Sequence, residues 1–343
     1  MGLRYANLLA GSYRIIGRSK MKPLIEWIEI PAGEFIFGLS NDQKARIRDR
    51  IREEIGYLSI PPEEHQLIES IMKKAEAKFT TSELNLLKSN KFSKMIALER
   101  ILERTSLLTI INLKTYYISK FPITEGQFRR FANEVVVNDP ARMYFVQNER
   151  YQPRGKPRTP SSAASGGVLN PKGNKDKLDV NTPVMVSWHL ADLFCQWTGT
   201  RLPSEAEWEK AARGVDGRLY PWGNNWDISR GNFLSRKNEV KRSISRDSLA
   251  TNVDAYPTGV SPYGVWDLAG NTYEWTSTVK ILGDGREGPI LKSSSVKYSL
   301  IDPWVDSVLA LYRPGGRAIT DYFEYTGFRP VQDEWTKSYW QGW

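Results

Sequence analysis

The sequence predicts an α+β fold that is irregular and rich in loops. Two stretches, Leu24–Phe37 and Leu113–Lys120, have the alternating pattern or the β-branched and aromatic content that is typical of short strands. Helices are predicted to begin after three capping residues, Thr124, Ser187 and Ser204. The 343 residues include 26 Gly and 12 Trp, which indicates loops held by aromatic anchors rather than a helical bundle.

Two of these helix starts are predicted capping boxes, in which two side chains satisfy free backbone amides of the first turn. Thr124 pairs with Gln127, and Ser204 pairs with Glu207. The second helix, residues 205–213, has carboxylates in its first turns, where the helix dipole favours them. Its mixture of charged, small and aromatic residues predicts an amphipathic helix on the protein surface.

The chain is predicted to have three parts. Residues 1–23 form an N-terminal arm, residues 24–40 and 111–343 form the main domain, and residues 41–110 form a helical insertion between them. Apolar residues spaced three or four apart indicate helices in the insertion, as in the stripe Ile47, Ile51 and Ile55. The insertion is expected either to pack on the flank of the domain or to bind a partner.

Composition excludes several classes of protein. With one cysteine (Cys195) and two histidines (His65 and His189), neither a disulfide framework nor a zinc or mononuclear iron site within one chain is expected. Cys195 is predicted to be a buried, inert thiol, and His189 a neutral, structural side chain. The net charge of +9 is spread along the chain, which predicts no dedicated nucleic-acid site. No stretch approaches the roughly 20 apolar residues of a membrane span, and a cytoplasmic location is expected.

Five motifs follow one another along the second half of the chain: VSWHLADLFCQWTG (Val186–Gly199), RLPSEAEWEKAAR (Arg201–Arg213), YPWGN (Tyr220–Asn224), SPYGVWDLAGNTYEW (Ser261–Trp275) and GFRPV (Gly327–Val331). In order and spacing this set resembles the formylglycine-generating enzyme family, also called the sulfatase-modifying-factor family. The resemblance covers roughly Glu26–Phe37 and Leu113–Val331. It implies a variant of the C-type lectin fold.

The resemblance also implies structural calcium, in one or two sites. A hard cation prefers carboxylate and carbonyl oxygens, and the stretch Asp267–Glu274 offers both in a compact loop. Carried over by position, the first set of ligands is Asp267, Gly270, Thr272 and Glu274. The second set is Asn232, Phe233, Asp247 and Leu249, although the spacing between its two pairs differs from that of the family. A turn stabilised by hydrogen bonds without metal is the alternative.

The family's oxidase chemistry needs two cysteines near the C-terminal end, because soft thiolate ligands select Cu(I). Here Ser293–Ser295 stands where the family has Gly-Gly-Ser, and the two cysteine positions fall at about Tyr298 and Pro303. The iron-binding histidine motif of the related sulfoxide synthases is also missing. Neither copper nor iron is therefore expected, and no catalytic residue is predicted.

The favoured function is that of a non-catalytic family member, a binding or scaffold subunit that recognises protein partners through its loops and helical insertion. Residues of the former active-site segment suit a ligand-facing surface: Tyr298, Trp304, Asp306, Tyr312, Arg313, Arg317 and Tyr322. Two alternatives stay open. One is an enzyme, oxidoreductase-like, with altered chemistry in the same cleft, and the other is a variable ligand-binding receptor of a diversity-generating system.

Overall fold

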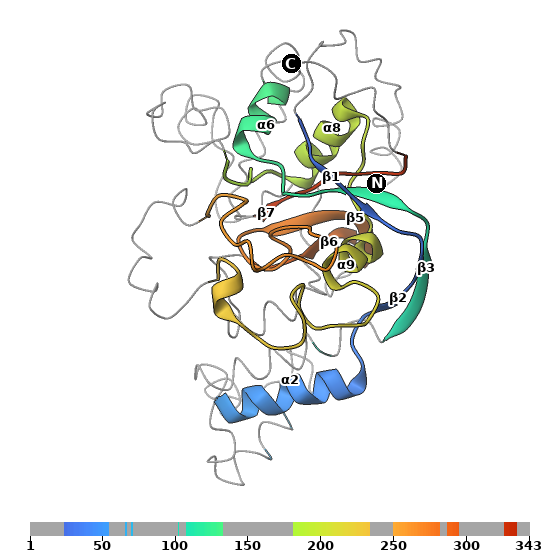
Figure 1. Cartoon of the computed structure of the whole chain (residues 1–343), viewed down its shortest axis with the longest axis vertical. Helices are drawn as coiled ribbons and strands as arrows, with labels where there is room; N and C mark the ends of the chain where they lie inside the picture. Colours follow the sequence, from blue (N-terminus) through green and yellow to red (C-terminus); the bar gives the residue numbers. More distant parts are fainter. Residues whose placement is uncertain are drawn as a thin grey trace.

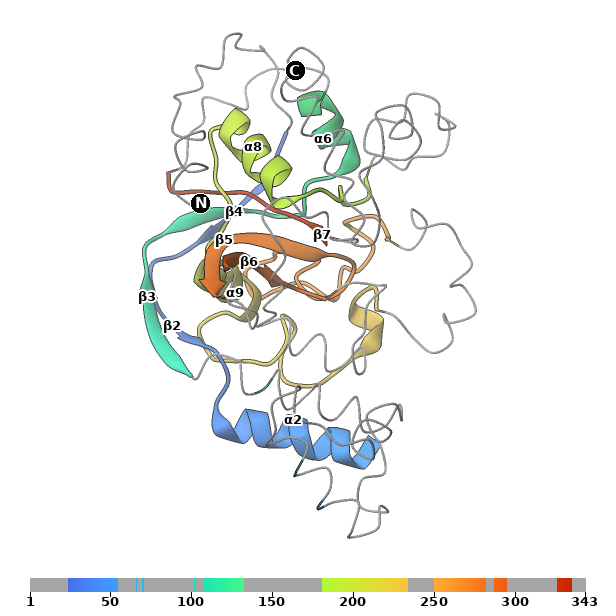
Figure 2. The ribbon, with the colours of Figure 1, turned by 180° about the vertical axis from the view of Figure 1, so that it is seen from behind.

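The computed structural model describes residues 24–54, 66, 70, 102, 108–132, 181–233, 250–281, 287–294 and 326–334. Short helices and small sheets alternate with long connections, which confirms the predicted α+β, loop-rich class. Helices α6 and α8 lie side by side at one end of the molecule, and α2 lies at the opposite end (Figure 1). Strands β5 and β6 and helix α9 lie between them, as the reverse view also shows (Figure 2).

The strands of the described residues form three small sheets. The first has the order β1–β4–β8, the second pairs β2 with β3, and the third has the order β6–β5–β7. Their bounds are β1 Trp27–Ile30, β2 Gly33–Phe37, β3 Thr109–Leu113, β4 Tyr116–Ser119, β5 Tyr273–Ile281, β6 Glu287–Lys292, β7 Thr326–Gly327 and β8 Val331–Gln332. All pairs are antiparallel except β5 with β7.

The stretch Leu24–Phe37, predicted to form short strands, contains β1 and β2, which belong to different sheets. β1 pairs with β4, with Trp27 opposite Ser119, and β2 pairs with β3, with Gly33 opposite Leu113. The connection at Pro31 and Ala32 therefore passes the chain from one sheet to the next instead of closing a hairpin.

The helices begin where their capping residues predict. In α6 (Glu125–Phe131) and α9 (Glu205–Arg213), both bonds of the capping box are formed. In α8 (Trp188–Thr198), the Ser187 side chain accepts a hydrogen bond from the Leu190 amide. A short 3-10 turn covers Ile228–Arg230. Helix α2 (Asn41–Glu54) opens the segment predicted to be a helical insertion. β3 already begins at Thr109, before the predicted end of that segment at residue 110.

Two hydrophobic clusters are formed by the residues that the structure describes. One lies between α6, α8 and the β5–β6 sheet and is built on stacked and edge-on rings, among them Phe128, Phe194 and Phe328. The other joins the β1–β4–β8 sheet to α9 through Trp208 and Ile118. Within the described residues, no helix is both long and apolar enough to cross a lipid bilayer.

Helix α9 is not the surface helix that its composition predicts. Apart from Ala206, every residue of the helix is buried, including three glutamates, a lysine and an arginine. The prediction was wrong because the charged side chains have partners on other elements, which the sequence of the helix alone does not reveal.

Candidate functional site

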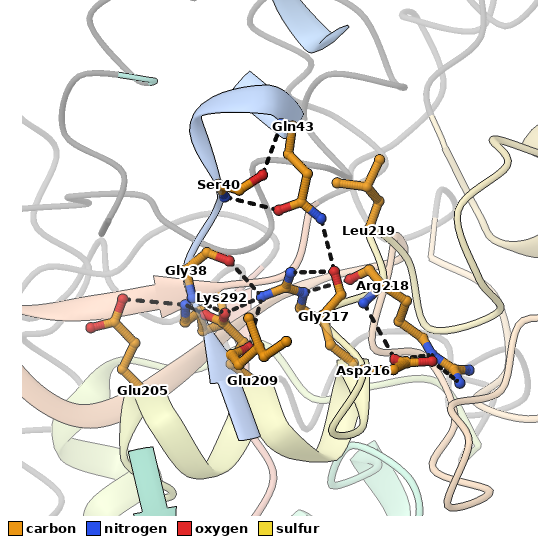
Figure 3. Close-up of polar contacts among 12 residues, drawn as sticks. Gly38, Ser40, Gln43, Glu205, Glu209, Asp216, Gly217, Arg218, Leu219 and Lys292 are labelled. Atoms are coloured by element: carbon orange, nitrogen blue, oxygen red, sulfur yellow. Dashed lines mark hydrogen bonds and ion pairs between the residues drawn. The ribbon is translucent and has the colours of Figure 1, made fainter. Parts of the chain in front are cut away.

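The centre of the molecule is a network of buried charges on one face of α9. Glu205, Glu209 and Arg213 recur every four residues and therefore share that face. The Glu209 carboxylate contacts Arg213 at 2.5 Å and the Lys292 ammonium at 3.0 Å, and all three side chains are fully buried. Lys292 also contacts Glu205 at 3.2 Å, and Glu205 contacts Lys280 at 2.7 Å. Figure 3 shows Glu205, Glu209 and Lys292 of this network close together.

The network fixes the connection from β2 to α2. The Gly38 amide donates to Glu209 Oε1 at 2.7 Å, and Arg213 Nη1 donates to the Gly38 carbonyl at 2.9 Å. Arg213 Nη2 also donates to the carbonyl of Gly217, which accepts a second bond from Gln43 in the first turn of α2. The start of the predicted insertion is therefore held by the same carbonyl as the end of α9 (Figure 3).

Lys292 connects the network to the segment that follows β6. Ser293, the next residue, has a φ of 66°, a left-handed conformation that favours glycine and that suits the position where the family has Gly. Its Oγ donates to the Gly270 carbonyl at 3.3 Å. The exit of β6 is thus tied both to α9 and to the Asp267–Glu274 loop.

The Asp267–Glu274 loop is tightly wound and packed against residues 231–233. Asp267, Gly270 and Asn271 all have positive φ, of 56°, 91° and 64°. A Cβ on Gly270 would lie 2.9 Å from the Asn232 carbonyl oxygen, so only glycine permits this approach. The Asn232 carbonyl accepts a hydrogen bond from the Asn271 backbone amide. The Asn232 side-chain amide donates a hydrogen bond to Asn271 Oδ1 at 3.0 Å.

Asp267 is a buried carboxylate, and its Oδ2 accepts a hydrogen bond from Asn271 Nδ2 at 3.0 Å. Burial, together with the nearby negative charges of Glu274 and Asp254, raises the pKa of Asp267 to about 7, although Asn271 and Arg329 act in the opposite direction. The surroundings of Asp267 therefore disfavour the charged form of its carboxyl group.

At the other end of the loop, the negative charge of Glu274 is paired with the positive charge of Arg329. Its two oxygens accept hydrogen bonds from Arg329 Nε at 2.6 Å and Arg329 Nη2 at 2.7 Å. Trp208 Nε1 of α9 donates to the same carboxylate at 2.7 Å. Both charged side chains are fully buried.

The predicted four-ligand calcium site fits these residues only in part. Asp267 is available, but both oxygens of Glu274 are engaged, and the Gly270 carbonyl already accepts bonds from the Thr272 amide and Ser293 Oγ. Among the described side chains, no group of three His, Cys, Asp or Glu is arranged to hold a metal ion. Calcium binding itself stays a prediction.

The second predicted calcium set is described only at Asn232 and Phe233. Both lie against the first set, because Asn232 bonds to Asn271 and the Phe233 ring packs beside Gly270. Asp247 and Leu249 lie outside the described residues. The structure thus brings the described halves of the two predicted sites together.

The chain's single thiol is part of the hydrophobic core. Cys195 lies fully buried in the core cluster of α8, and burial raises the pKa of the thiol well above its ordinary value. Burial likewise lowers the pKa of His189, which agrees with a neutral side chain. The predicted recognition residues between Tyr298 and Tyr322 lie outside the described residues.

Comparison with known protein families shows which family this chain belongs to. Residues 88–296 match the family described as the sulfatase-modifying factor enzyme 1-like domain. The chain belongs to this family. The predicted resemblance is therefore confirmed, and the fold is of the formylglycine-generating-enzyme type.

Two relatives within the sulfatase-modifying factor family come from Mus musculus. Inactive C-alpha-formylglycine-generating enzyme 2 is 31% identical over 220 residues, which cover 57% of this chain and 66% of that protein. Formylglycine-generating enzyme is 39% identical over 104 residues, which cover 28% of this chain and 27% of that protein. The chain thus spans less than two thirds of the length of these relatives. The solved structure of PvdO from Pseudomonas aeruginosa is 16% identical, with coverage of 92% and 96% and a TM-score of 0.48.

Two central residues were missed by sequence reasoning. Lys292 and Arg329 are the counter-ions of Glu209 and Glu274, but each lies more than fifty positions away from its partner along the chain. The only available signal was the spacing of Glu205, Glu209 and Arg213, which places three charges on one helical face.

Proposed function

We propose that this chain is a non-catalytic member of the sulfatase-modifying factor family and acts as a binding or scaffold subunit of a larger assembly. The observation that carries the proposal is the state of its thiol. Cys195 is the single cysteine of the sequence, and it is fully buried in the core. A Cu(I) site of two thiolates cannot be built from it. A relative that is 31% identical bears the word inactive in its name.

The charged core supports a scaffold role. A fully buried ion pair contributes little net stability against an apolar equivalent, but it holds its elements in one arrangement. Here the Glu209–Lys292 contact holds the end of β6, from which the segment with the predicted recognition residues departs. Loops on a rigid frame are where recognition commonly resides.

Copper binding tests the non-catalytic half of the proposal. The purified full chain is reduced and titrated with Cu(I) against a chromophoric chelator that competes for the metal. We expect the chelator to keep all of the copper, and the Cys195→Ser variant to behave identically. Retention of one copper per chain that is lost in Cys195→Ser would overturn this half.

Partner capture tests the binding half. The full chain, isolated from its native source with bound proteins, is compared with a triple variant, Tyr312→Ala, Arg313→Ala and Tyr322→Ala. Val215→Ser with Ile228→Ser, which alters two exposed apolar side chains elsewhere, is the matched control. We expect a stoichiometric partner that the triple variant loses and the control retains. Equal recovery with both variants would show that this surface is not the recognition site.

A further inference from the structure

The two sides of the β2–β3 sheet have different surroundings. On the β2 side, α9 supplies two cationic side chains: Lys210 Nζ donates to the Gly33 carbonyl at 2.9 Å, and Arg213 Nη1 donates to the Ile36 carbonyl at 3.4 Å. On the other side, β3 pairs with no strand of the described residues except β2. β3 lies on the outer rim of the molecule in both Figure 1 and Figure 2. An edge of this kind offers backbone donors and acceptors to a further strand.

β3 also lacks the features that keep edge strands from pairing. Such strands are commonly protected by charged side chains, by proline or by being very short. β6 contains Pro289, β1 contains Glu29 and is followed by Pro31, and β7 and β8 have two residues each. β3 has five residues, and none of them is charged or a proline. Two of the five are isoleucines, which favour strand pairing.

The outward face of the sheet at β3 carries exposed apolar side chains. Ile110 is 63% exposed, and Leu108, two positions earlier, is 44% exposed. Ile110 lies opposite Ile36 in the register, and the alternation of side chains places the buried Phe35 and Phe37 on the other face. A strand added at this edge would place side chains beside both Ile110 and Leu108.

We infer that β3 pairs with the β3 strand of a second copy of this chain, antiparallel and about a two-fold axis at Ile110. Such an axis stands perpendicular to the sheet, so each residue lies opposite one on the same face. The two Ile110 side chains then lie opposite each other, and Leu108 lies opposite Asn112 of the second copy. The two sheets join into one sheet of four strands in the order β2–β3–β3–β2.

A second copy fits this edge because the same uncharged strand is presented on both sides. Isoleucine meets isoleucine at the axis, and no like charges within the strand are brought together. The dimer is expected to be weak, because the pairing of two short strands buries less surface than a standard interface. It should form at high chain concentration and dissociate on dilution. This inference does not depend on the binding role proposed above.

Sedimentation velocity of the purified full chain over a dilution series tests the interface. Ile110→Lys places like charges opposite each other, which should raise the dimer dissociation constant by about tenfold or more. Ile110→Glu should do the same, and an equal mixture of the two variants should restore the dimer because opposite charges then meet. Ile228→Lys is the matched control, since Ile228 is 48% exposed and lies in the 3-10 turn. It should dimerise as the wild type does.

Oxidative cross-linking tests the register. The native Cys195 is buried, so cross-links should form through an added thiol. Directly opposed Cα atoms of an antiparallel pair lie about 4.5–5.5 Å apart, a separation that a disulfide can bridge. Ile110→Cys should therefore form a covalent dimer on mild oxidation. Asn112→Cys, on the same strand and face, should not, because Leu108 of the second copy lies opposite it.

Three results would overturn the inference. One is a wild-type chain that stays monomeric throughout the dilution series. Another is a dimer that Ile110→Lys and Ile228→Lys weaken equally, which would place the interface elsewhere. The third is cross-linking of Asn112→Cys in preference to Ile110→Cys. Because the Ile110 side chain is exposed, each variant at this position is expected to keep the wild-type Tm, which thermal unfolding checks.

Discussion

Two buried acidic regions of this molecule differ in how their charge is compensated. On α9, Glu209 contacts both Arg213 and Lys292, and Glu205 contacts Lys292 and Lys280. In the Asp267–Glu274 loop, Asp267 accepts a hydrogen bond from a neutral amide and has Glu274 and Asp254 as neighbouring negative charges. In the first region each carboxylate contacts cationic side chains, whereas in the second region burial raises the pKa of Asp267 to about 7.

The difference shows that burial of charge by itself indicates no function in this family member. A buried carboxylate with a fixed counter-ion is part of the frame, as Glu209 and Glu274 both are. A buried carboxylate without one is a candidate for binding. Four substitutions test this difference between the two regions.

Glu209→Ala is expected to have the largest effect, because it leaves Arg213 and Lys292 buried without their shared carboxylate. The loss of one partner from a buried ion pair costs about 3–5 kcal/mol. Urea unfolding measures it, with Asp216→Ala as the control, since Asp216 forms an exposed pair with Arg218 and its loss should cost about 0–1 kcal/mol. Equal effects at the two positions would contradict the assigned role of the network.

Asp267→Asn is expected to act in the opposite direction. In EDTA at pH 8 the variant removes a buried, uncompensated charge and keeps a side chain of the same shape, so stability should increase by about 1–3 kcal/mol. Thermal unfolding in EDTA checks this. A loss of stability would mean that the wild-type carboxylate is better compensated than its contacts indicate.

Glu207 gives an intermediate case, because it is buried and its partner Arg201 is half-exposed. Burial alone would raise the pKa of Glu207, but hydrogen bonds from Arg201 and Ser204 outweigh it, and the net shift is downward. A lowered pKa contributes stability that is present above the ordinary value of about 4.3 and is lost as the pH falls through the folded-state pKa. Glu207→Gln should therefore be less stable by about 1 kcal/mol at pH 7. Its Tm should fall less steeply than that of the wild type below pH 4.5, and parallel curves would contradict this.

Thr124→Ala is expected to have the smallest effect on stability. It gives a reference value for a contact that lies outside both regions. It removes the capping hydroxyl of α6, which the Gln127 amide contacts at 3.3 Å, at a cost of about 0.5–1 kcal/mol. Thermal unfolding measures it against Thr124→Ser, which keeps the hydroxyl. A loss as large as that of Glu209→Ala would place α6 rather than α9 at the centre of stability.

Local structure was predictable from the sequence where neighbouring residues decide it. The caps at Thr124, Ser187 and Ser204 are formed by side chains three positions from the amides they satisfy. The burial of α9 was not predictable, because Lys292 and Gly38, which satisfy Glu209, are remote in sequence.

The same limit applies to the candidate site, where the sequence predicts local placement but not the contacts between remote residues. The motif places Asp267 and Glu274 in one loop, but only tertiary structure shows that Arg329 neutralises one of the two carboxylates. The motif therefore places both acidic residues in one loop, but it does not distinguish their surroundings.

Metal content is the most direct test of the central claim that this chain is a scaffold without the family's redox centre. The purified full chain is measured by inductively coupled plasma mass spectrometry before and after chelation. The expected result is no copper or iron at a level near one per chain, with any calcium removed by the chelator. Copper or iron near one per chain that survives the chelation step would contradict the claim and show a redox centre in this protein.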